Sequence, residues 1–185
     1  MSAEVFPPAT TALESMVRQL LDREAIREAL HRYCRGVDRV DVDAIRSAYW
    51  PDAEDHHGEY VGGPEGLIER VIEGYSPTDH VVHSICNTSI ALRGDQADVE
   101  AYFIALHALE VGEDGVRIQT FLAGRYLDVF EKRAEEWRVL RRTVVYDWIR
   151  KSRLVDGLGE AAFSSRQPVG LHAPHDLVYE FESLR

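Results

Sequence analysis

The chain has 185 residues, 45% hydrophobic and 29% charged, which is the size and composition of one globular domain. Its formal net charge of -11 argues against nucleic-acid and membrane partners, because both surfaces are bound by clustered Lys and Arg. No apolar run approaches the ~20 residues of a membrane span. Two cysteines, Cys34 and Cys86, make no disulfide framework, so we expect a reduced cytoplasmic protein.

Helical periodicity dominates the first part of the chain. Apolar residues recur every three or four positions over Leu13–Val37, which predicts one kinked helix or two helices, because Asp22 can cap a second start. A shorter helix is predicted over Val42–Tyr49. A third runs from Pro64 to about Tyr75, with the proline in its first turn.

After these helices the apolar residues alternate instead. Four long runs are rich in Val, Ile, Tyr, Phe and Thr, and short polar turns separate them. They cover His80–Leu92, Ala97–Val111, Val116–Glu131 and Trp137–Lys151. Long consecutive strands with short connections predict an antiparallel meander, strongly curved if the helices pack inside it. The expected fold class is α+β, a cone-shaped barrel with N-terminal helices packed in a curved antiparallel sheet.

The two ends of the chain lack such periodicity. We interpret residues 1–11 as a leader, 12–152 as a single domain and 153–185 as an extended tail. The tail contains several Gly and Pro residues together with isolated apolar ones. We expect it to cover the mouth of a pocket or to contact a neighbouring subunit.

Asp38 is a polar residue at the end of an apolar stripe. It follows Leu30 and Cys34 at intervals of four, so a continued helix points its carboxylate toward the core. A buried carboxylate without a partner costs several kcal/mol, on the order of the penalty for an unpaired buried ion, and therefore needs a donor. The alternative is that Gly36 ends the helix and leaves Asp38 solvated in the turn.

His83 is a second polar residue on an apolar face. It shares the parity of Val81 and Ile85 in its predicted strand. A lone strand histidine is more often a core residue than a catalyst. An inward aspartate in the same small domain changes that balance, because a carboxylate bonded to an imidazole fixes its tautomer and raises its basicity. Asp38 and His83 are therefore candidates for an acid/base pair.

Two further polar residues have inward parity. His107 alternates with Phe103, which places it toward the concave interior. Arg142 alternates with Val144, so its guanidinium lies on an apolar face. There it either binds a leaving anion or oxyanion, or forms an ion pair with an acidic side chain.

The run from Asp52 to His57 contains two aspartates, a glutamate and two histidines, as metal sites do. Its histidines are adjacent and not four residues apart on a helix, and it contains no cysteine. We interpret it as a solvated strand start with one inward histidine, and we predict no metal site.

Several segments resemble a known superfamily. The order of elements, the segment DREAIREALHRYCRGVDRVDVDAIRSAYWPDAE, the turn GGPEG and the closing strand WRVL are similar to the SnoaL-like branch of the nuclear transport factor 2-like fold. This branch includes scytalone dehydratase, hexachlorocyclohexane dehydrochlorinase and bile-acid 7α-dehydratase. The resemblance covers about residues 12–152 and supports the predicted fold more specifically than any activity.

The resemblance assigns catalytic roles to two residues. Asp38 matches the aspartate of the dehydrochlorinase and dehydratase dyads, and His83 matches their histidine base. Tyr33 matches a pocket tyrosine of the bile-acid enzyme, and His107 lies where scytalone dehydratase has its second histidine.

Other positions are assigned to substrate binding. Arg142 matches the arginine that assists chloride departure in the dehydrochlorinase. Tyr146 stands where the bile-acid enzyme has an arginine, and His57 stands where two dehydratases have a pocket tyrosine, so this chain departs from both patterns. The inward strand faces add pocket-lining residues, namely Phe103, Tyr126, Val144 and Trp148.

The resemblance implies a cofactor-independent lyase that performs a dehydratase-like elimination on a small, largely apolar cyclic substrate. Steroid-, terpenoid- or polyketide-like molecules fit this description. Isomerisation by the same base is the second choice. A non-catalytic ligand-binding or assembly module and the small subunit of a ring-hydroxylating dioxygenase share the fold and stay as alternatives. The family also implies a homodimer or homotrimer.

Overall fold

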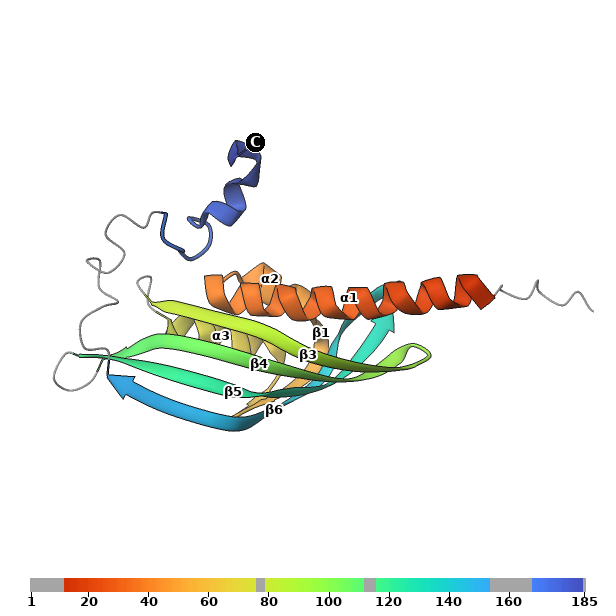
Figure 1. Cartoon of the computed structure of the whole chain (residues 1–185), viewed down its shortest axis with the longest axis horizontal. Coiled ribbons are helices and arrows are strands. Elements are labelled where there is room, and N and C mark those ends of the chain that lie inside the picture. Colours follow the sequence, from red (N-terminus) through yellow and green to blue (C-terminus); the bar gives the residue numbers. More distant parts are fainter. Residues whose placement is uncertain (1–11, 76–78, 112–115, 154–167, 185) are drawn as a thin grey trace, which may run out of the picture.

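The computed structural model describes residues 12–75, 79–111, 116–153 and 168–184. Helices and a bent sheet form two layers, with α1 running along the sheet (Figure 1). The elements are α1 (Ala12–Arg39), α2 (Val42–Ala48), β1 (Tyr49–His57), β2 (Tyr60–Gly62), α3 (Pro64–Gly74), β3 (His80–Arg93), β4 (Gln96–Val111), β5 (Arg117–Arg133), β6 (Glu136–Arg153) and the 3₁₀ helix η1 (Leu177–Leu184).

The six strands lie in the order β2-β1-β6-β5-β4-β3. The predicted antiparallel meander is confirmed for β3 to β6, since each strand pairs with the next in antiparallel register. β1 pairs with β6 in parallel, which makes the sheet mixed. Helices on one face of a strongly curved sheet confirm the α+β cone.

α1 is one continuous helix. Asp22 does not cap a second start, because its carboxylate accepts the Trp137 indole N–H at 2.8 Å and pairs with Lys132 at 3.1 Å. The helix ends where Val40 takes a φ of 52°, and Asp41 then caps α2 by accepting the Ala44 N–H at 3.0 Å. Within the described chain, no helix is long and apolar enough to cross a membrane.

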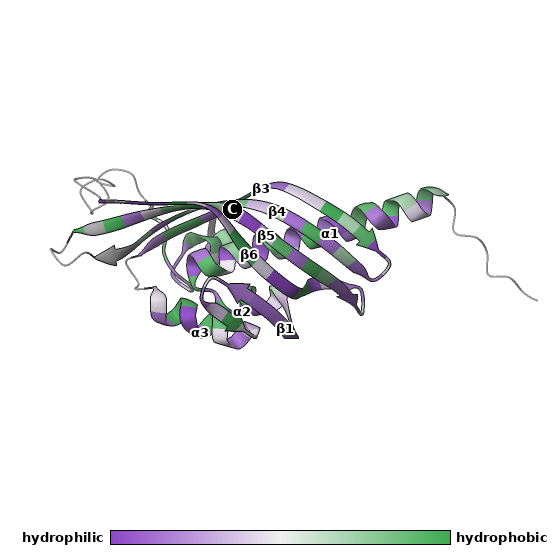
Figure 2. Cartoon of the chain, turned by 90° about the horizontal axis from the view of Figure 1, so that it is seen from below, coloured by the Kyte–Doolittle hydropathy of each residue, from purple (hydrophilic) through white to green (hydrophobic). Residues whose placement is uncertain are grey.

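The core lies between the helices and the inward face of the sheet. In Figure 2 apolar and polar residues alternate along the long strands, as a half-buried sheet requires. Gly124 allows the closest packing here: a Cβ at this position would lie 2.2 Å from the Val145 carbonyl oxygen and 3.0 Å from the Phe103 ring. The Phe103 ring stacks on Tyr126 at 4.5 Å.

A register shift corrects the prediction for Trp148. β6 carries an extra residue opposite β5, since Gly124 pairs with Tyr146 whereas Ala123 pairs with Trp148. Such a bulge breaks the alternation on which inward parity rests. Trp148 is accordingly 62% exposed and does not line the interior, whereas Tyr146 is partly buried.

The described part of the tail packs on the C-terminal end of α1. Asp176 accepts the backbone N–H groups of Leu171 and Val178 and forms an ion pair with Arg39 at 3.1 Å. The Tyr179 hydroxyl donates to Asp41 at 2.7 Å. By capping Val178, Asp176 starts the helix η1, so this stretch is helical where an extended chain was expected.

Candidate active site

Asp38 and His83 meet at the junction of α1 and β3. Asp38 Oδ1 lies 2.7 Å from His83 Nδ1, and Asp38 Oδ2 accepts the backbone N–H of His83 at 3.0 Å. The two side chains are only 12% and 6% exposed, so Asp38 is not the solvated turn residue of the alternative interpretation. A carboxylate only accepts, so Nδ1 carries the hydrogen and the neutral ring keeps its lone pair on Nε2.

A cavity of about 220 Å³ opens beside this pair. It is lined by His31, Cys34, Arg35, Asp38, Arg39, His83 and Ile85. Arg39 also holds the tail through Asp176, so the docked tail lies next to this opening.

His107 lies against the other edge of His83. The two Nε2 atoms are 3.4 Å apart, and the Tyr75 ring lies edge-on to His107 at 6.3 Å. Burial, reinforced by His83 and His57, lowers the pKa of His107 to about 3. His107 therefore stays neutral near pH 7, where it can share a hydrogen bond with His83 without repelling a proton on that ring.

A second carboxylate–histidine pair lies on β1. Asp55 and His57 are two residues apart and face inward together, with Asp55 Oδ1 and His57 Nδ1 at 3.5 Å. Asp55 is fully buried and accepts the Tyr49 hydroxyl at 2.5 Å. Burial by itself raises the pKa of Asp55, but His57 and Arg142 outweigh it and the pKa is lowered.

Asp55 was missed in the sequence, although its parity with His57 was visible there. The other charged residues and the other histidine of the run from Asp52 to His57 lie at the surface. Glu54 pairs with His56 at the surface, and Asp52 pairs with Arg133. The alternation of β1 thus divides the run between two faces of the sheet.

Arg142 forms a buried ion pair with Asp128 on the neighbouring strand. Nε and Nη2 donate to the two carboxylate oxygens at 2.8 and 2.7 Å, and both side chains are 0% exposed. Nη1 donates to the Tyr49 hydroxyl at 3.1 Å. The structure thus shows Arg142 in an ion pair with an acidic side chain, which is the second of the two interpretations given for this residue.

Aromatic rings surround this ion pair. The Arg142 guanidinium lies over Tyr33 and Tyr126, 4.3 and 4.1 Å from their centroids. Tyr33 is buried, and burial raises its pKa well above the usual range. Tyr33 thus packs on Arg142 in the core, and Phe103 and Val144 are buried on the inward face.

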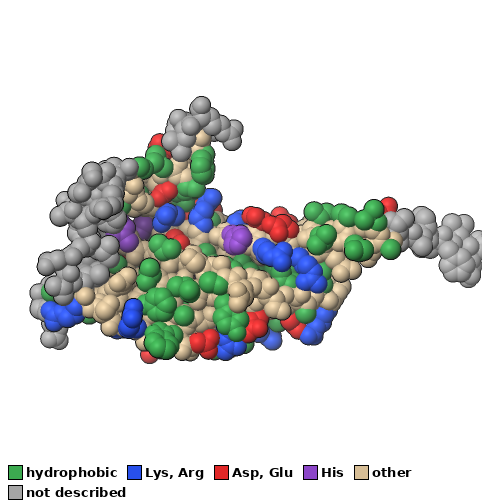
Figure 3. Space-filling model, viewed as in Figure 1, with side chains coloured by type: hydrophobic (Ala, Val, Ile, Leu, Met, Phe, Trp, Pro, Cys, Tyr) green, Lys and Arg blue, Asp and Glu red, His purple; other side chains and the backbone are tan. Residues whose placement is uncertain are grey.

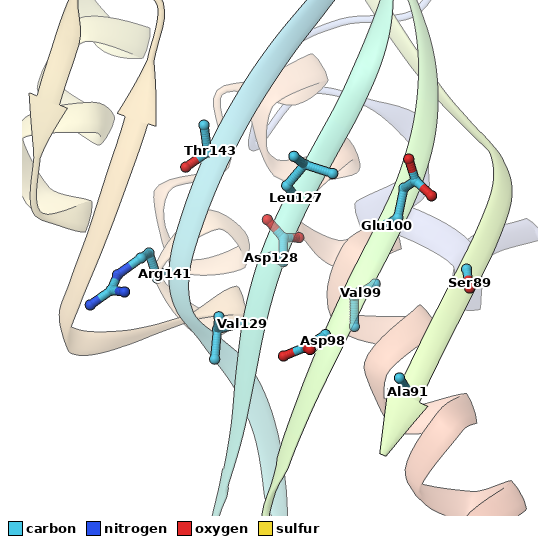
Figure 4. Close-up of a pocket in the computed structure, with 10 residues that line it drawn as sticks. All are labelled: Ser89, Ala91, Asp98, Val99, Glu100, Leu127, Asp128, Val129, Arg141 and Thr143. Atoms are coloured by element: carbon cyan, nitrogen blue, oxygen red, sulfur yellow. The ribbon is translucent and has the colours of Figure 1, made fainter. Parts of the chain in front are cut away.

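A wider hollow of about 580 Å³ crosses the outer side of the sheet (Figure 4). Its lining includes Leu127 and Thr143, which are exposed on that side. It is a surface groove and contains none of the three interior histidines.

Residues 18–143 match the profile of the SnoaL-like domain family. The chain belongs to this family. Solved structures share the fold of this SnoaL-like protein. Hexachlorocyclohexane dehydrochlorinase LinA-type3 of Novosphingobium barchaimii is 20% identical with a TM-score of 0.64, and the alignment covers 75% of this chain and 95% of that one.

Two structures from Novosphingobium aromaticivorans are also similar. A protein assigned as a scytalone dehydratase is 16% identical with a TM-score of 0.63, covering 76% of this chain and 93% of that one. A protein assigned as an aromatic ring hydroxylase is 26% identical with a TM-score of 0.61, covering 76% and 98%. At such identities the likeness shows the fold. No curated protein matches the chain in sequence.

Proposed function

We propose that this SnoaL-like protein is a cofactor-independent lyase that eliminates water from a small, largely apolar cyclic substrate. The observation that carries the proposal is the Asp38–His83 pair, in which both carboxylate oxygens hold one histidine. A partly buried imidazole with a fixed tautomer is suited to remove a proton near neutral pH. The dehydratase and dehydrochlorinase among the structural neighbours support an elimination.

In this mechanism Nε2 of His83 takes a proton from the carbon next to a carbonyl group. The ionised Asp38 stabilises the imidazolium that forms, because their atoms are 2.7 Å apart and both side chains are largely buried. His107 is neutral and accepts a hydrogen bond from the protonated His83. The acidity comes from the substrate, so the proton transfer needs no cofactor.

The interior favours a ring-shaped, apolar substrate. Phe103 stacks on Tyr126, and the Tyr146 ring lies edge-on to Phe103 at 6.4 Å. Flat aromatic walls bind flat or ring-shaped molecules well and exclude water from the charges that develop. We propose a steroid-, terpenoid- or polyketide-like ring as the substrate.

The tail and the outer sheet face suggest how the site is enclosed and assembled. We assign residues 12–152 to the catalytic domain and the tail to a cover beside the opening, supported by the contacts of Asp176 and Tyr179 with the end of α1. Figure 3 shows hydrophobic side chains on the side of the sheet that faces the viewer. On β3 and β4, Val82, Tyr102, Ile104 and Leu106 are exposed. Such a face supports self-association into a dimer or trimer.

The test uses paired variants. Asp38→Asn and His83→Gln are compared with Asp43→Asn and His56→Gln, which change exposed residues of the same types. Cyclic β-hydroxy ketones serve as substrates, and the enone product is followed by its ultraviolet absorption. We expect the dyad variants to lose about 10²–10⁴-fold in kcat/KM and the controls to keep wild-type rates. Near wild-type activity in either dyad variant would disprove the assignment.

A further inference from the structure

We infer that His57 donates the proton that the departing oxygen needs, with Asp55 as its positioning residue. This inference rests on the proposed elimination and extends it. The site then contains two carboxylate–imidazole pairs with opposite tasks: Asp38–His83 accepts a proton and Asp55–His57 supplies one. The geometry of β1, the shape of the sheet and a buried chain of contacts support it.

The pairing fixes which edge of His57 is free. Asp55 Oδ1 and His57 Nδ1 are both buried, and within the described residues neither makes a regular hydrogen bond, to each other or to another group. They face each other at 3.5 Å, so the carboxylate orients the ring. The side chain is nevertheless 26% exposed. The rest of the side chain, away from the buried Nδ1, provides this exposure, and we place the free Nε2 edge there.

The same interior receives both pairs. β1 and β3 lie near opposite ends of the strand order of one curved sheet, and we place their inward faces on the same interior. The His57 ring lies edge-on to Tyr146 at 6.4 Å, and Tyr146 lies edge-on to Phe103. Electrostatic repulsion from His57 also helps to lower the pKa of His107.

Asp55 is supported from the core. Its other oxygen accepts the Tyr49 hydroxyl, which in turn accepts Nη1 of Arg142 at 3.1 Å. Arg142 is itself fixed by its two bonds to Asp128. This chain of contacts gives the buried Arg142 ion pair a function: it holds an ionised carboxylate behind His57. The carboxylate stabilises a protonated His57, whose Nε2–H then points to the open side.

The two histidines together balance an elimination of water. The C–H bond of the substrate breaks and its proton goes to Nε2 of His83, while the electron pair forms the new C=C bond. The C–O bond breaks, and Nε2–H of His57 gives its proton to the departing oxygen, so that water leaves. His83 is then protonated and His57 neutral, and exchange with solvent restores both. Chloride leaves without a proton, so the donor selects a hydroxyl leaving group.

The deciding experiment compares two leaving groups. Cyclic β-hydroxy ketones and the matching β-chloro ketones are assayed with wild type, His57→Gln and Asp55→Asn, with background elimination subtracted. We expect both variants to lose about 10²-fold or more on the hydroxy substrates and less than about 3-fold on the chloro substrates. Partial misfolding lowers both rates equally, so the ratio of the rates separates a chemical role from a structural one. His56→Gln, the adjacent surface histidine, should leave the ratio unchanged.

Equal losses on both leaving groups, or no loss, would overturn the donor role of His57. Failure of the proposed function looks different, because wild type and the His83→Gln variant would then be equally inactive on both substrates. The pair is also tested without a substrate. Histidine ¹⁵N spectra of the wild-type protein at pH 7 should show a hydrogen on Nδ1 of His57, and an unprotonated Nδ1 would overturn the pairing with Asp55.

Discussion

Replacing Arg142 by methionine tests whether the buried ion pair is a structural support. The change leaves the Asp128 carboxylate at 0% exposure without its two charge-assisted hydrogen bonds. Burial already raises the pKa of Asp128 even against Arg142, so the carboxyl group would take up a proton. The variant also loses the donor to Tyr49 and the cation stacked on Tyr33.

The expected cost follows from these losses. Removing one partner of a buried ion pair destabilises a protein by about 3–5 kcal/mol. With a urea m-value of about 2 kcal/mol/M for a protein of this size, the unfolding midpoint should fall by about 2 M. The assay is equilibrium urea unfolding followed by circular dichroism. The double variant Arg142→Met with Asp128→Leu should regain more than half of the loss, because it leaves no unpaired charge.

Arg46→Met is the matched control, since Arg46 forms a bidentate pair with Glu65 at the surface. Exposed pairs contribute little, so its midpoint should stay close to wild type. The reasoning is refuted if Arg142→Met unfolds like this control, or if the double variant is no more stable than Arg142→Met alone. Either result would mean that the buried ion pair does not support the fold in this way.

Two further predictions concern pH and the tail. Because the pKa of His107 is lowered to about 3, the unfolded chain binds more protons between pH 6.5 and 3, and stability falls as the pH falls through this window. Wild type should therefore lose about 1.4 kcal/mol per pH unit more than His107→Gln between pH 6 and 4; equal slopes in acid-dependent urea unfolding would contradict this. Asp176→Asn should release the tail from Arg39 and make it cleavable by chymotrypsin at Tyr179 and Phe181 several-fold faster, with the urea midpoint of the domain unchanged. Cleavage at the wild-type rate would show that the tail docks without this ion pair.

The helices, the meander and the inward positions of Asp38 and His83 were predictable because they follow from local periodicity, whereas the pairing of the two residues came from the family resemblance. A polar residue on an apolar face is visible in the sequence, and in the structure Asp38 and His83 are in contact. Asp128 carried the same signal, since it alternates with Tyr126 and Phe130, both buried. Its partner was not predictable, because the pairing of Asp128 with Arg142 depends on the register of β5 against β6.

Other features could not be derived from the pattern. The bulge in β6 that turns Trp148 outward depends on strand pairing and leaves no mark in the alternation. The parallel pairing of β1 with β6 likewise depends on how the helices return the chain to the sheet. The second pair, Asp55 and His57, was concealed by its neighbours, because adjacent acids and histidines suggested one cluster where the strand makes two.

The two oxygens of Asp38 bind different parts of His83, one its ring and the other its backbone. The same side chain thus orients the imidazole and ties the first helix to the sheet. The tail, the turns and the strand ends can therefore change without moving this imidazole, because its position is fixed where the two layers join.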